Sequence, residues 1–276
     1  MKDFSNNVEI ELQNLNKSFQ DNLVLKNLNL KILSGKTTVI MGGSGAGKTV
    51  LLKHLMGLLK PDSGKIFIKG EDVTAKTGEE LDKLRLRFAM VFQFAALLNS
   101  LTVGQNVGLG LKERGELTQK EIDEIVDEKL RLVGLAGKQH IMPGELSGGM
   151  KKRVGVARAL AMNPEVILYD EPTAGLDPFM AGNVDELILD LKNRLKMTSV
   201  VVTHDMNSAF YVGDRICMLH EGRVIEEGTP GEIQNSTNPI TRQFITRHSG
   251  SVPGSLRAEG KAIPSFEIAS GLRPSQ

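Results

Sequence analysis

Gly42-Gly-Ser-Gly-Ala-Gly-Lys-Thr49 is the stretch of this sequence that predicts its fold. A short apolar run, residues 37–41, precedes it, and residues 50–59 repeat apolar side chains at helical spacing. In a loop of the pattern G-x-x-x-x-G-K-S/T between a buried strand and a helix, backbone N–H groups bind phosphate oxygens. Lys48 is then placed to reach the β- and γ-phosphates and Thr49 to ligate Mg²⁺. The stretch therefore predicts a site for ATP and Mg²⁺.

Strands of a different pattern surround this loop. Residues 8–15 and 23–32 alternate apolar and polar side chains, which is typical of half-buried strands. Residues 65–69 alternate in the same way, directly after the turn signal of Pro61 to Gly64. These strands are expected to form a small antiparallel sheet.

Two further apolar runs, residues 165–169 and 199–203, lack alternation and predict buried strands, with a helix over 181–195 between them. Such a β–α–β order predicts right-handed crossovers and a mainly parallel sheet covered by helices on both faces. Residues 95–155 are expected to be mainly helical, with Thr118 and Glu121 as a capping box. The predicted fold class is α/β: a P-loop NTPase core with an antiparallel β subdomain and an inserted α-helical subdomain.

Two carboxylates follow the predicted strand 165–169 and therefore lie at the sheet edge where nucleotides bind in open α/β sheets. Asp170 is suited to hold the Mg²⁺ shell, and Glu171 to orient and deprotonate the attacking water. The competing interpretation is a solvated pair at a helix start, stabilised by the helix dipole. The phosphate loop favours the hydrolytic role.

Three more residues acquire a role once ATP is assumed. Gln93 follows an apolar run and can ligate Mg²⁺ or position the water. His204 follows the buried strand 199–203 and can hydrogen-bond the γ-phosphate, although a lone histidine is more often structural. Phe19 can stack on adenine, and a core phenylalanine fits its position equally well.

Leu146-Ser-Gly-Gly-Met-Lys-Lys-Arg153 predicts a second anion site, because Ser-Gly-Gly stands at a helix N-terminus. One ATP cannot easily occupy two such sites in the same chain. A head-to-tail homodimer resolves this, since each chain then offers its Ser147 to the ATP of the other.

With these motifs in family order, residues 8–247 closely resemble the ATP-binding subunits of ABC transporters, with Ala174-Gly-Leu-Asp177 matching the D-loop. The resemblance implies an ATP hydrolase that dimerises on ATP binding and drives two membrane permease subunits, whose coupling helix docks on the helical segment at about 95–155. It assigns catalysis to Glu171, His204, Lys48 and Gln93, and the metal to Thr49, Gln93 and Asp170. The implied nucleotide contacts are Phe19, Gly42, Gly43, Ser44, Gly45, Ala46, Gly47, Lys48, Thr49, Val50, Gln93, Ser147, Gly148, Gly149, Asp177 and His204.

The chain departs from the commonest pattern at Met150 in the signature and at Val50 after the loop threonine. Together with the stretches 47–54 and 169–178, these departures make it resemble the Mla/Mce-type lipid-transport branch. That branch implies phospholipid transport and a location on the cytoplasmic face of the inner membrane, peripheral through the permeases. It also implies a small cytoplasmic regulatory subunit and a periplasmic lipid-binding subunit as partners. The alternative is an ABC importer for another solute, such as polar amino acids.

Composition excludes other classes. The formal net charge is +1 and 12 of 276 residues are aromatic, so neither a basic face nor a stacking platform for nucleic acid is expected. DNA-repair ATPases of similar motif content insert long coiled coils, whereas Lys48 and Ser147 lie 99 positions apart (147 − 48) without sustained heptads. The single cysteine, Cys217, is expected to be a buried hydrophobe, and no signal-peptide region opens the chain.

Two segments keep two interpretations each. Phe94-Ala-Ala-Leu-Leu98 is either an apolar contact surface for the permease or ordinary helix core. The tail, residues 248–276, is either a disordered terminus or an extended arm that packs on a partner.

Overall fold

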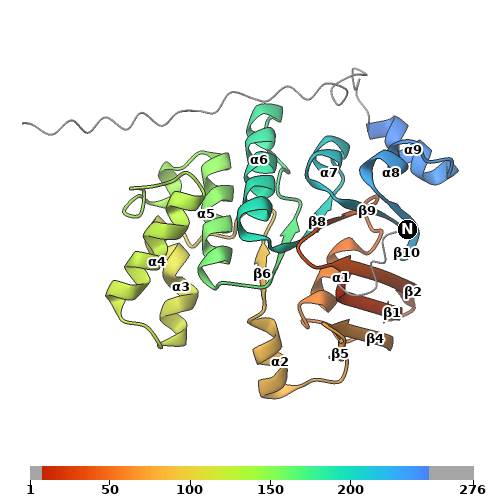
Figure 1. Cartoon of the computed structure of the whole chain (residues 1–276), viewed down its shortest axis with the longest axis horizontal. Coiled ribbons are helices and arrows are strands. Elements are labelled where there is room, and N and C mark those ends of the chain that lie inside the picture. Colours follow the sequence, from red (N-terminus) through yellow and green to blue (C-terminus); the bar gives the residue numbers. More distant parts are fainter. Residues whose placement is uncertain (1–7, 249–276) are drawn as a thin grey trace, which may run out of the picture.

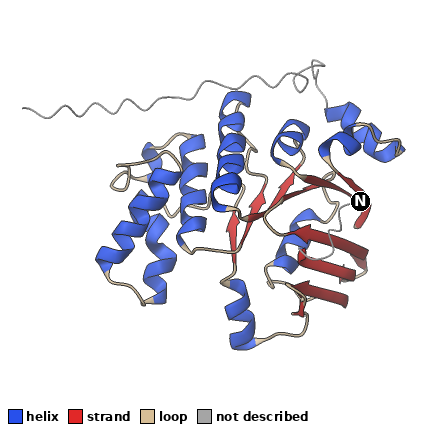
Figure 2. Cartoon of the chain, in the orientation of Figure 1, coloured by secondary structure: helices blue, strands red, loops and turns tan. Residues whose placement is uncertain are grey.

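The structure is a computed structural model and describes residues 8–248; nearly all of the predicted tail lies outside these residues. In the described part, two sheets and the helices between and beside them make up the fold (Figures 1 and 2). The larger sheet has the order β10-β9-β3-β8-β7-β6, with β3 (Thr37–Met41), β6 (Phe88–Val91), β7 (Val166–Asp170), β8 (Thr198–Thr203), β9 (Arg215–His220) and β10 (Arg223–Gly228). All neighbours pair in parallel except β10 and β9. The predicted mainly parallel sheet is confirmed.

The central strands supply two separate cores. Val39 and Met41 pack into one cluster with the helices that lie between residues 103 and 212. Ile40, between them in sequence, packs into the other cluster, on the opposite face of the sheet. On β8, Val201 and Val202 divide in the same way. Side chains of a strand alternate between faces, so an apolar run without polar positions is required when helices cover both faces.

The antiparallel sheet has the order β2-β1-β4-β5, built from β1 (Val8–Phe19), β2 (Asn22–Leu33), β4 (Ser63–Ile68) and β5 (Glu71–Asp72). Helix α1 (Lys48–Leu55) packs Leu51 and Leu52 into the core shared with this sheet. It ends earlier than the apolar run 50–59 predicts, and Gly57 just beyond it adopts φ +64°. The predicted small antiparallel sheet is confirmed.

The helices on the other side of the main sheet lie at the left and top of Figure 1. The capping box of Thr118 and Glu121 is present. The first helix of the predicted helical segment begins at Val103 rather than near residue 95, because residues 93–96 form a turn in which Ala95 and Ala96 have positive φ. The helices are α2 (Gly78–Arg85), α3 (Val103–Arg114), α4 (Gln119–Leu132), α5 (Gly148–Ala161), α6 (Pro178–Leu195), α7 (Met206–Val212), α8 (Pro230–Gln234) and α9 (Pro239–His248), with a 3₁₀ turn, η1 (Pro143–Glu145).

The interpretation of Phe94 as a helix-core residue is therefore wrong, because its side chain is 84% exposed in that turn. Cys217 is buried as expected, and burial raises the pKa of its thiol to about 12. Within residues 8–248, no helix has the length and apolar character needed to cross a membrane.

Candidate functional site

The phosphate loop leaves the C-terminal end of β3 and enters α1. Gly45 and Gly47 have φ of +76° and +103°, a region that side-chain-bearing residues rarely adopt. No side chain caps α1, and its first turn contains no acidic residue. The positive end of the helix dipole and its free N–H groups therefore face the loop, which is the arrangement that binds phosphate.

Lys48 is held by the loop itself. Its Nζ donates to the carbonyl oxygens of Gly42 at 2.8 Å and Gly43 at 3.0 Å. Burial lowers the pKa of Lys48, and the carboxylates of Glu171 and Asp170 oppose that shift. The ammonium thus lies within the electrostatic reach of both predicted catalytic carboxylates.

Neighbouring parts of the loop are fixed by packing. A Cβ on Gly42 would lie 2.2 Å from the Leu219 carbonyl oxygen of β9, so only glycine fits there. Ala46 is buried, and the side chain of Val50 packs against the core. Ser44 on the loop and Thr49 in the first turn of α1 are exposed.

The C-terminal ends of four neighbouring strands gather the other predicted residues. β3 ends at the phosphate loop, β6 two residues before Gln93, β7 at Asp170 and β8 one residue before His204. These strands are parallel neighbours, so their ends meet at one edge. The structure therefore brings together residues that the sequence separates by more than 150 positions.

Glu171 and His204 form a pair. Nδ1 of His204 lies 2.8 Å from Oε2 of Glu171, whose side chain is 14% exposed. Glu171 has φ +48°, and its N–H donates to the Val202 carbonyl at 2.8 Å. This left-handed conformation at the strand end turns the carboxylate toward His204, where it can accept a proton from water.

Asp170 fits the predicted metal. Burial, with the Glu171 carboxylate as the next cause, raises the pKa of Asp170. Lys48 and Lys53 oppose this shift, and among residues 8–248 no donor hydrogen-bonds the Asp170 carboxylate, so a bound cation would stabilise its charged form further. Oxygen donors from Asp170, Thr49 and Gln93 are of the type that Mg²⁺ prefers. No cluster of three or more His, Cys, Asp or Glu side chains that could hold a metal ion is found among the described residues, at this edge or elsewhere.

The Ser-Gly-Gly signature lies at the start of α5. Ser147 is the N-cap, and its Oγ accepts from the Met150 N–H at 3.3 Å. A Cβ on Gly149 would lie 2.2 Å from Cε of Met180 in α6, so the signature packs against the start of that helix. Within the described residues, no hydrogen bond joins Ser147 to the phosphate loop of its own chain. This agrees with a signature that serves a second chain.

The D-loop and adenine-stacking residues lie at the surface. Oδ1 of Asp177 caps α6, accepting from the N–H groups of Phe179 and Met180 at 3.1 and 3.0 Å. Phe179 is exposed, next to Met180, the residue of α6 that lies close to Gly149 of the signature. Phe19 is exposed at the end of β1, with Nζ of Lys17 5.6 Å from its ring centroid. Phe19 is therefore not a core residue and remains available for stacking.

Sequence reasoning missed Lys152, a buried lysine of α5. Its Nζ donates to the carbonyl oxygens of Gln93 and Glu171. The signal was present, because Lys152 shares a helix face with the buried Gly149 and Val156.

Asp185, on α6, was also missed. Ser208 Oγ of α7 donates to Asp185 Oδ2 at 2.6 Å, and Thr173 Oγ1, before the D-loop, lies 3.3 Å from Ser208 Oγ. Burial raises the pKa of Asp185 to about 6; the Ser208 hydrogen bond opposes this shift and Asp205 adds to it. The network joins the segments that carry Glu171 and His204.

Asp185→Asn is expected to change how stability depends on pH. Because the folded pKa exceeds the ordinary value, the folded state keeps a proton that the unfolded state has lost, so wild-type stability falls as pH rises from about 4 through 6. The full shift corresponds to about 3 kcal/mol, of which about half develops between pH 5 and pH 8. We expect wild type to lose ~1.5 kcal/mol of unfolding free energy between pH 5 and pH 8 relative to the variant, as measured by urea unfolding at both pH values.

Glu186→Gln removes an exposed carboxylate from the same helix and is the matched control. It should show no comparable change. Equal pH dependence in wild type and Asp185→Asn would contradict a raised Asp185 pKa.

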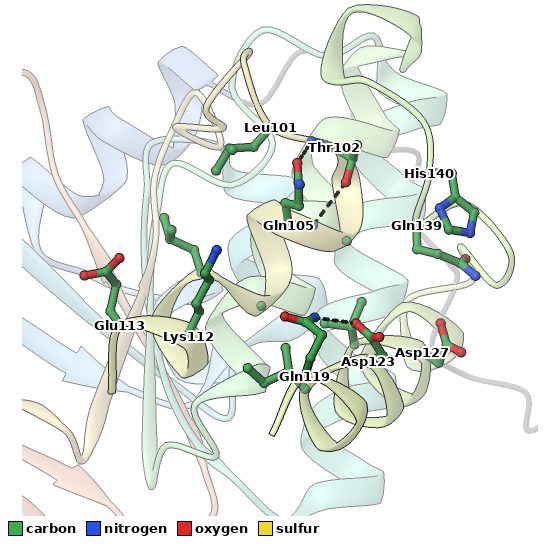
Figure 3. A pocket seen from close by; sticks show the side chains of 15 residues that line it. Leu101, Thr102, Gln105, Lys112, Glu113, Gln119, Asp123, Asp127, Gln139 and His140 are labelled. Atoms are coloured by element: carbon green, nitrogen blue, oxygen red, sulfur yellow. Dashed lines mark hydrogen bonds between the residues drawn. The ribbon is translucent and has the colours of Figure 1, made fainter. Parts of the chain in front are cut away.

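A pocket of about 670 Å³ lies between α3 and α4 (Figure 3). Its lining is mixed: Lys112 and Glu113 come from α3, Gln119 and Asp123 from α4, and His140 from the segment after α4. Gln119 Nε2 donates to Asp123 Oδ1 at 2.8 Å across one helical turn. The pocket lies in the segment predicted to meet the permease.

The sequence profile described as ABC transporter matches residues 25–174. The "Probable ribonucleotide transport ATP-binding protein mkl" of Mycobacterium leprae is 40% identical over 238 residues, covering 86% of this chain and 69% of the relative. The "Intermembrane phospholipid transport system ATP-binding protein MlaF" of Haemophilus influenzae is 39% identical over 240 residues, covering 87% of this chain and 91% of the relative.

Among solved structures, an ATP-binding cassette in a dimeric post-hydrolysis state bound to ADP and Pi superposes with a TM-score of 0.72. It is 36% identical and covers 80% of this chain and 98% of that chain. In that protein, the bound ADP and phosphate are products of ATP hydrolysis.

Proposed function

Because this chain belongs to the ABC transporter family, we propose that it is the ATP-hydrolysing subunit of a transporter that moves phospholipids across the cell envelope. The observation that carries the hydrolytic part is the convergence of the phosphate loop, Asp170 and the Glu171–His204 pair at one sheet edge. Similarity to an intermembrane phospholipid transport ATPase along most of both chains supports the lipid.

The residues at this sheet edge have separate roles in the proposed reaction. The loop N–H groups and Lys48 bind the phosphates, and Mg²⁺ on Thr49, Gln93 and Asp170 would offset the charge of the β- and γ-phosphates. Glu171 takes a proton from the attacking water, and His204 holds the Glu171 carboxylate in place. Ser147, Gly148 and Gly149 of a second copy complete each site in a head-to-tail homodimer. The dimeric state of the solved relative supports this assembly.

The partners we propose are two integral-membrane permease subunits, which hold the ATPase peripherally at the cytoplasmic face of the inner membrane. A small cytoplasmic regulatory subunit and a periplasmic lipid-binding subunit complete the proposal. The domain division proposed is an ATPase domain over 8–247, with its helical subdomain at about 95–155, and the tail.

Purification of the tagged chain from native membranes, with mass spectrometry of co-purifying proteins and lipids, tests the substrate. Permease subunits with bound phospholipid would support the proposal. A tightly bound amino acid without lipid would instead identify an importer for a small polar solute, and bound permease would still support the ATPase role.

Phe94→Ser is expected to weaken binding to the permease at least tenfold, because a large exposed aromatic side chain is a typical interface anchor. Phe94 lies at the start of the segment 94–102, which leads to the pocket between α3 and α4. Asn106 of α3 fixes this segment, because its Oδ1 accepts from the Leu98 N–H at 2.8 Å. Co-purification yield in detergent measures the effect. Leu58→Ser, at an exposed apolar residue after α1, is the control and should bind normally. Equal yields for both variants would remove Phe94 from the interface.

A further inference from the structure

Lys152 is the most deeply buried cationic side chain near the site, with 6% of its surface exposed. Burial lowers its pKa, and Glu171 is the one charged neighbour that opposes the shift. Burying an ammonium group is unfavourable unless it is well hydrogen-bonded. Its position on the signature helix α5, five residues after Ser147, therefore calls for a physical explanation.

The Lys152 ammonium joins two strands of the sheet edge. β6 and β7 pair with each other up to Val91 and Tyr169, and β7 stays paired with β8 as far as Asp170. Just beyond these ends, the carbonyls of Gln93 and Glu171 no longer have ladder partners, and Nζ of Lys152 donates to both, at 3.5 Å to Glu171. One side chain of α5 thus holds the backbone of both residues proposed to act on the attacking water.

A second cation of α5 reinforces the link. Arg158 donates to the carbonyls of Ala95 and Ala96, both at 2.7 Å. Both alanines have positive φ, an unfavourable conformation that these hydrogen bonds help to maintain. The turn that follows Gln93 is therefore attached to α5 at three carbonyl groups.

Glu171 also requires such support. Its φ of +48° is unfavourable for a side-chain-bearing residue, and the Ala174 N–H donates to its carbonyl at 3.2 Å beside Lys152. A displacement of α5 would alter this conformation and with it the direction of the carboxylate toward His204.

We propose that Lys152 is a positioning residue that couples the two ATP sites of the dimer. This rests on the proposed function, in which the Ser147 end of α5 contacts the ATP of the partner subunit. ATP at the partner's site then sets the position of α5, and Lys152 transmits that position to Gln93 and Glu171 of its own chain. Each site becomes fully competent only when the other is occupied.

Lys152→Met tests this, because methionine has similar length and an apolar end. Hydrogen exchange without nucleotide should rise about fivefold or more in peptides covering 92–98 and 171–176, since their carbonyl anchor is lost. Exchange in β3 and α1 should stay unchanged. The kcat for ATP should fall about tenfold with KM nearly unchanged, and the Hill coefficient for ATP should fall from above one to about one.

Lys151→Met is the matched control on the next residue of the same helix, which carries no comparable hydrogen bond in the described structure, and it should behave as wild type. Lys152→Gln keeps a donor and should recover part of the kcat. If Lys152→Met does not fold, Lys152→Leu, which also lacks a donor, takes its place, and wild-type exchange and kcat in that variant would overturn the proposal.

Unchanged exchange in 92–98 and 171–176 would overturn the proposal. So would a wild-type Hill coefficient of one, or a variant that keeps the wild-type coefficient. A parallel loss of melting temperature, ATP affinity and kcat would show a general structural role instead. If the wild-type chain fails to hydrolyse ATP, the proposed function falls and the coupling with it; if it does hydrolyse ATP and Lys152→Met does so equally, only the coupling falls.

Discussion

Glu171→Gln is expected to lower ATP turnover by at least two orders of magnitude while ATP still binds, because the amide cannot accept the proton of the attacking water. The substitution keeps the size of the side chain and an oxygen that can lie near His204, which pairs with Glu171 at 2.8 Å. The phosphate loop and Asp170 are untouched. The variant should therefore accumulate as a closed, ATP-bound dimer.

Single-turnover hydrolysis and gel filtration with ATP measure these two effects. Glu165→Gln is a control on the same segment, because Glu165 pairs with Arg87 and Lys69 away from the sheet edge. Its turnover should match wild type. Turnover near the wild-type rate in Glu171→Gln would remove Glu171 as the base.

Ser147→Asp is expected to abolish hydrolysis without affecting ATP binding by the isolated chain. Aspartate is as good an N-cap as serine, so α5 keeps its start, where Ser147 Oγ now accepts from the Met150 N–H. In the proposed dimer, the new carboxylate faces the γ-phosphate of the partner's ATP. Like charges placed together cost several kcal/mol, which corresponds to at least a hundredfold loss of activity.

Equilibrium dialysis of ATP at protein concentrations too low for dimerisation isolates the chain's own site. Lys48→Ala should lose binding there, Ser147→Asp should not, and Ser147→Asn should keep the cap without the charge. If Ser147→Asp weakens this binding as much as Lys48→Ala does, the signature acts within its own chain and the head-to-tail arrangement is wrong.

Much of this fold could be predicted because its signals are local. The run 37–41 has no polar alternation because its side chains enter two cores, and this periodicity is visible in the sequence. The phosphate loop requires specific residue types at fixed spacing. Asp170 and Glu171 could be placed near it because parallel strands that end in polar residues share an edge.

The missing parts depend on contacts distant in sequence. The need for glycine at Gly42 arises from the Leu219 carbonyl, 177 positions later (219 − 42). The positive φ of Ala95 and Ala96 delays the first helix of the inserted segment, and Arg158, more than 60 residues away, maintains it. Alanine is a strong helix former, so local propensity predicts the opposite.

At Glu171, the residue type that would best stabilise the backbone differs from the one that the proposed reaction requires. Its left-handed backbone costs a residue with a Cβ about 1–2 kcal/mol, so glycine would suit the strand end better. Selection for thermal stability alone would drive this position toward glycine, and only selection for turnover retains the carboxylate. In descendants of this chain that no longer hydrolyse ATP, Glu171 is therefore among the first residues we expect to drift, while the phosphate loop outlasts it.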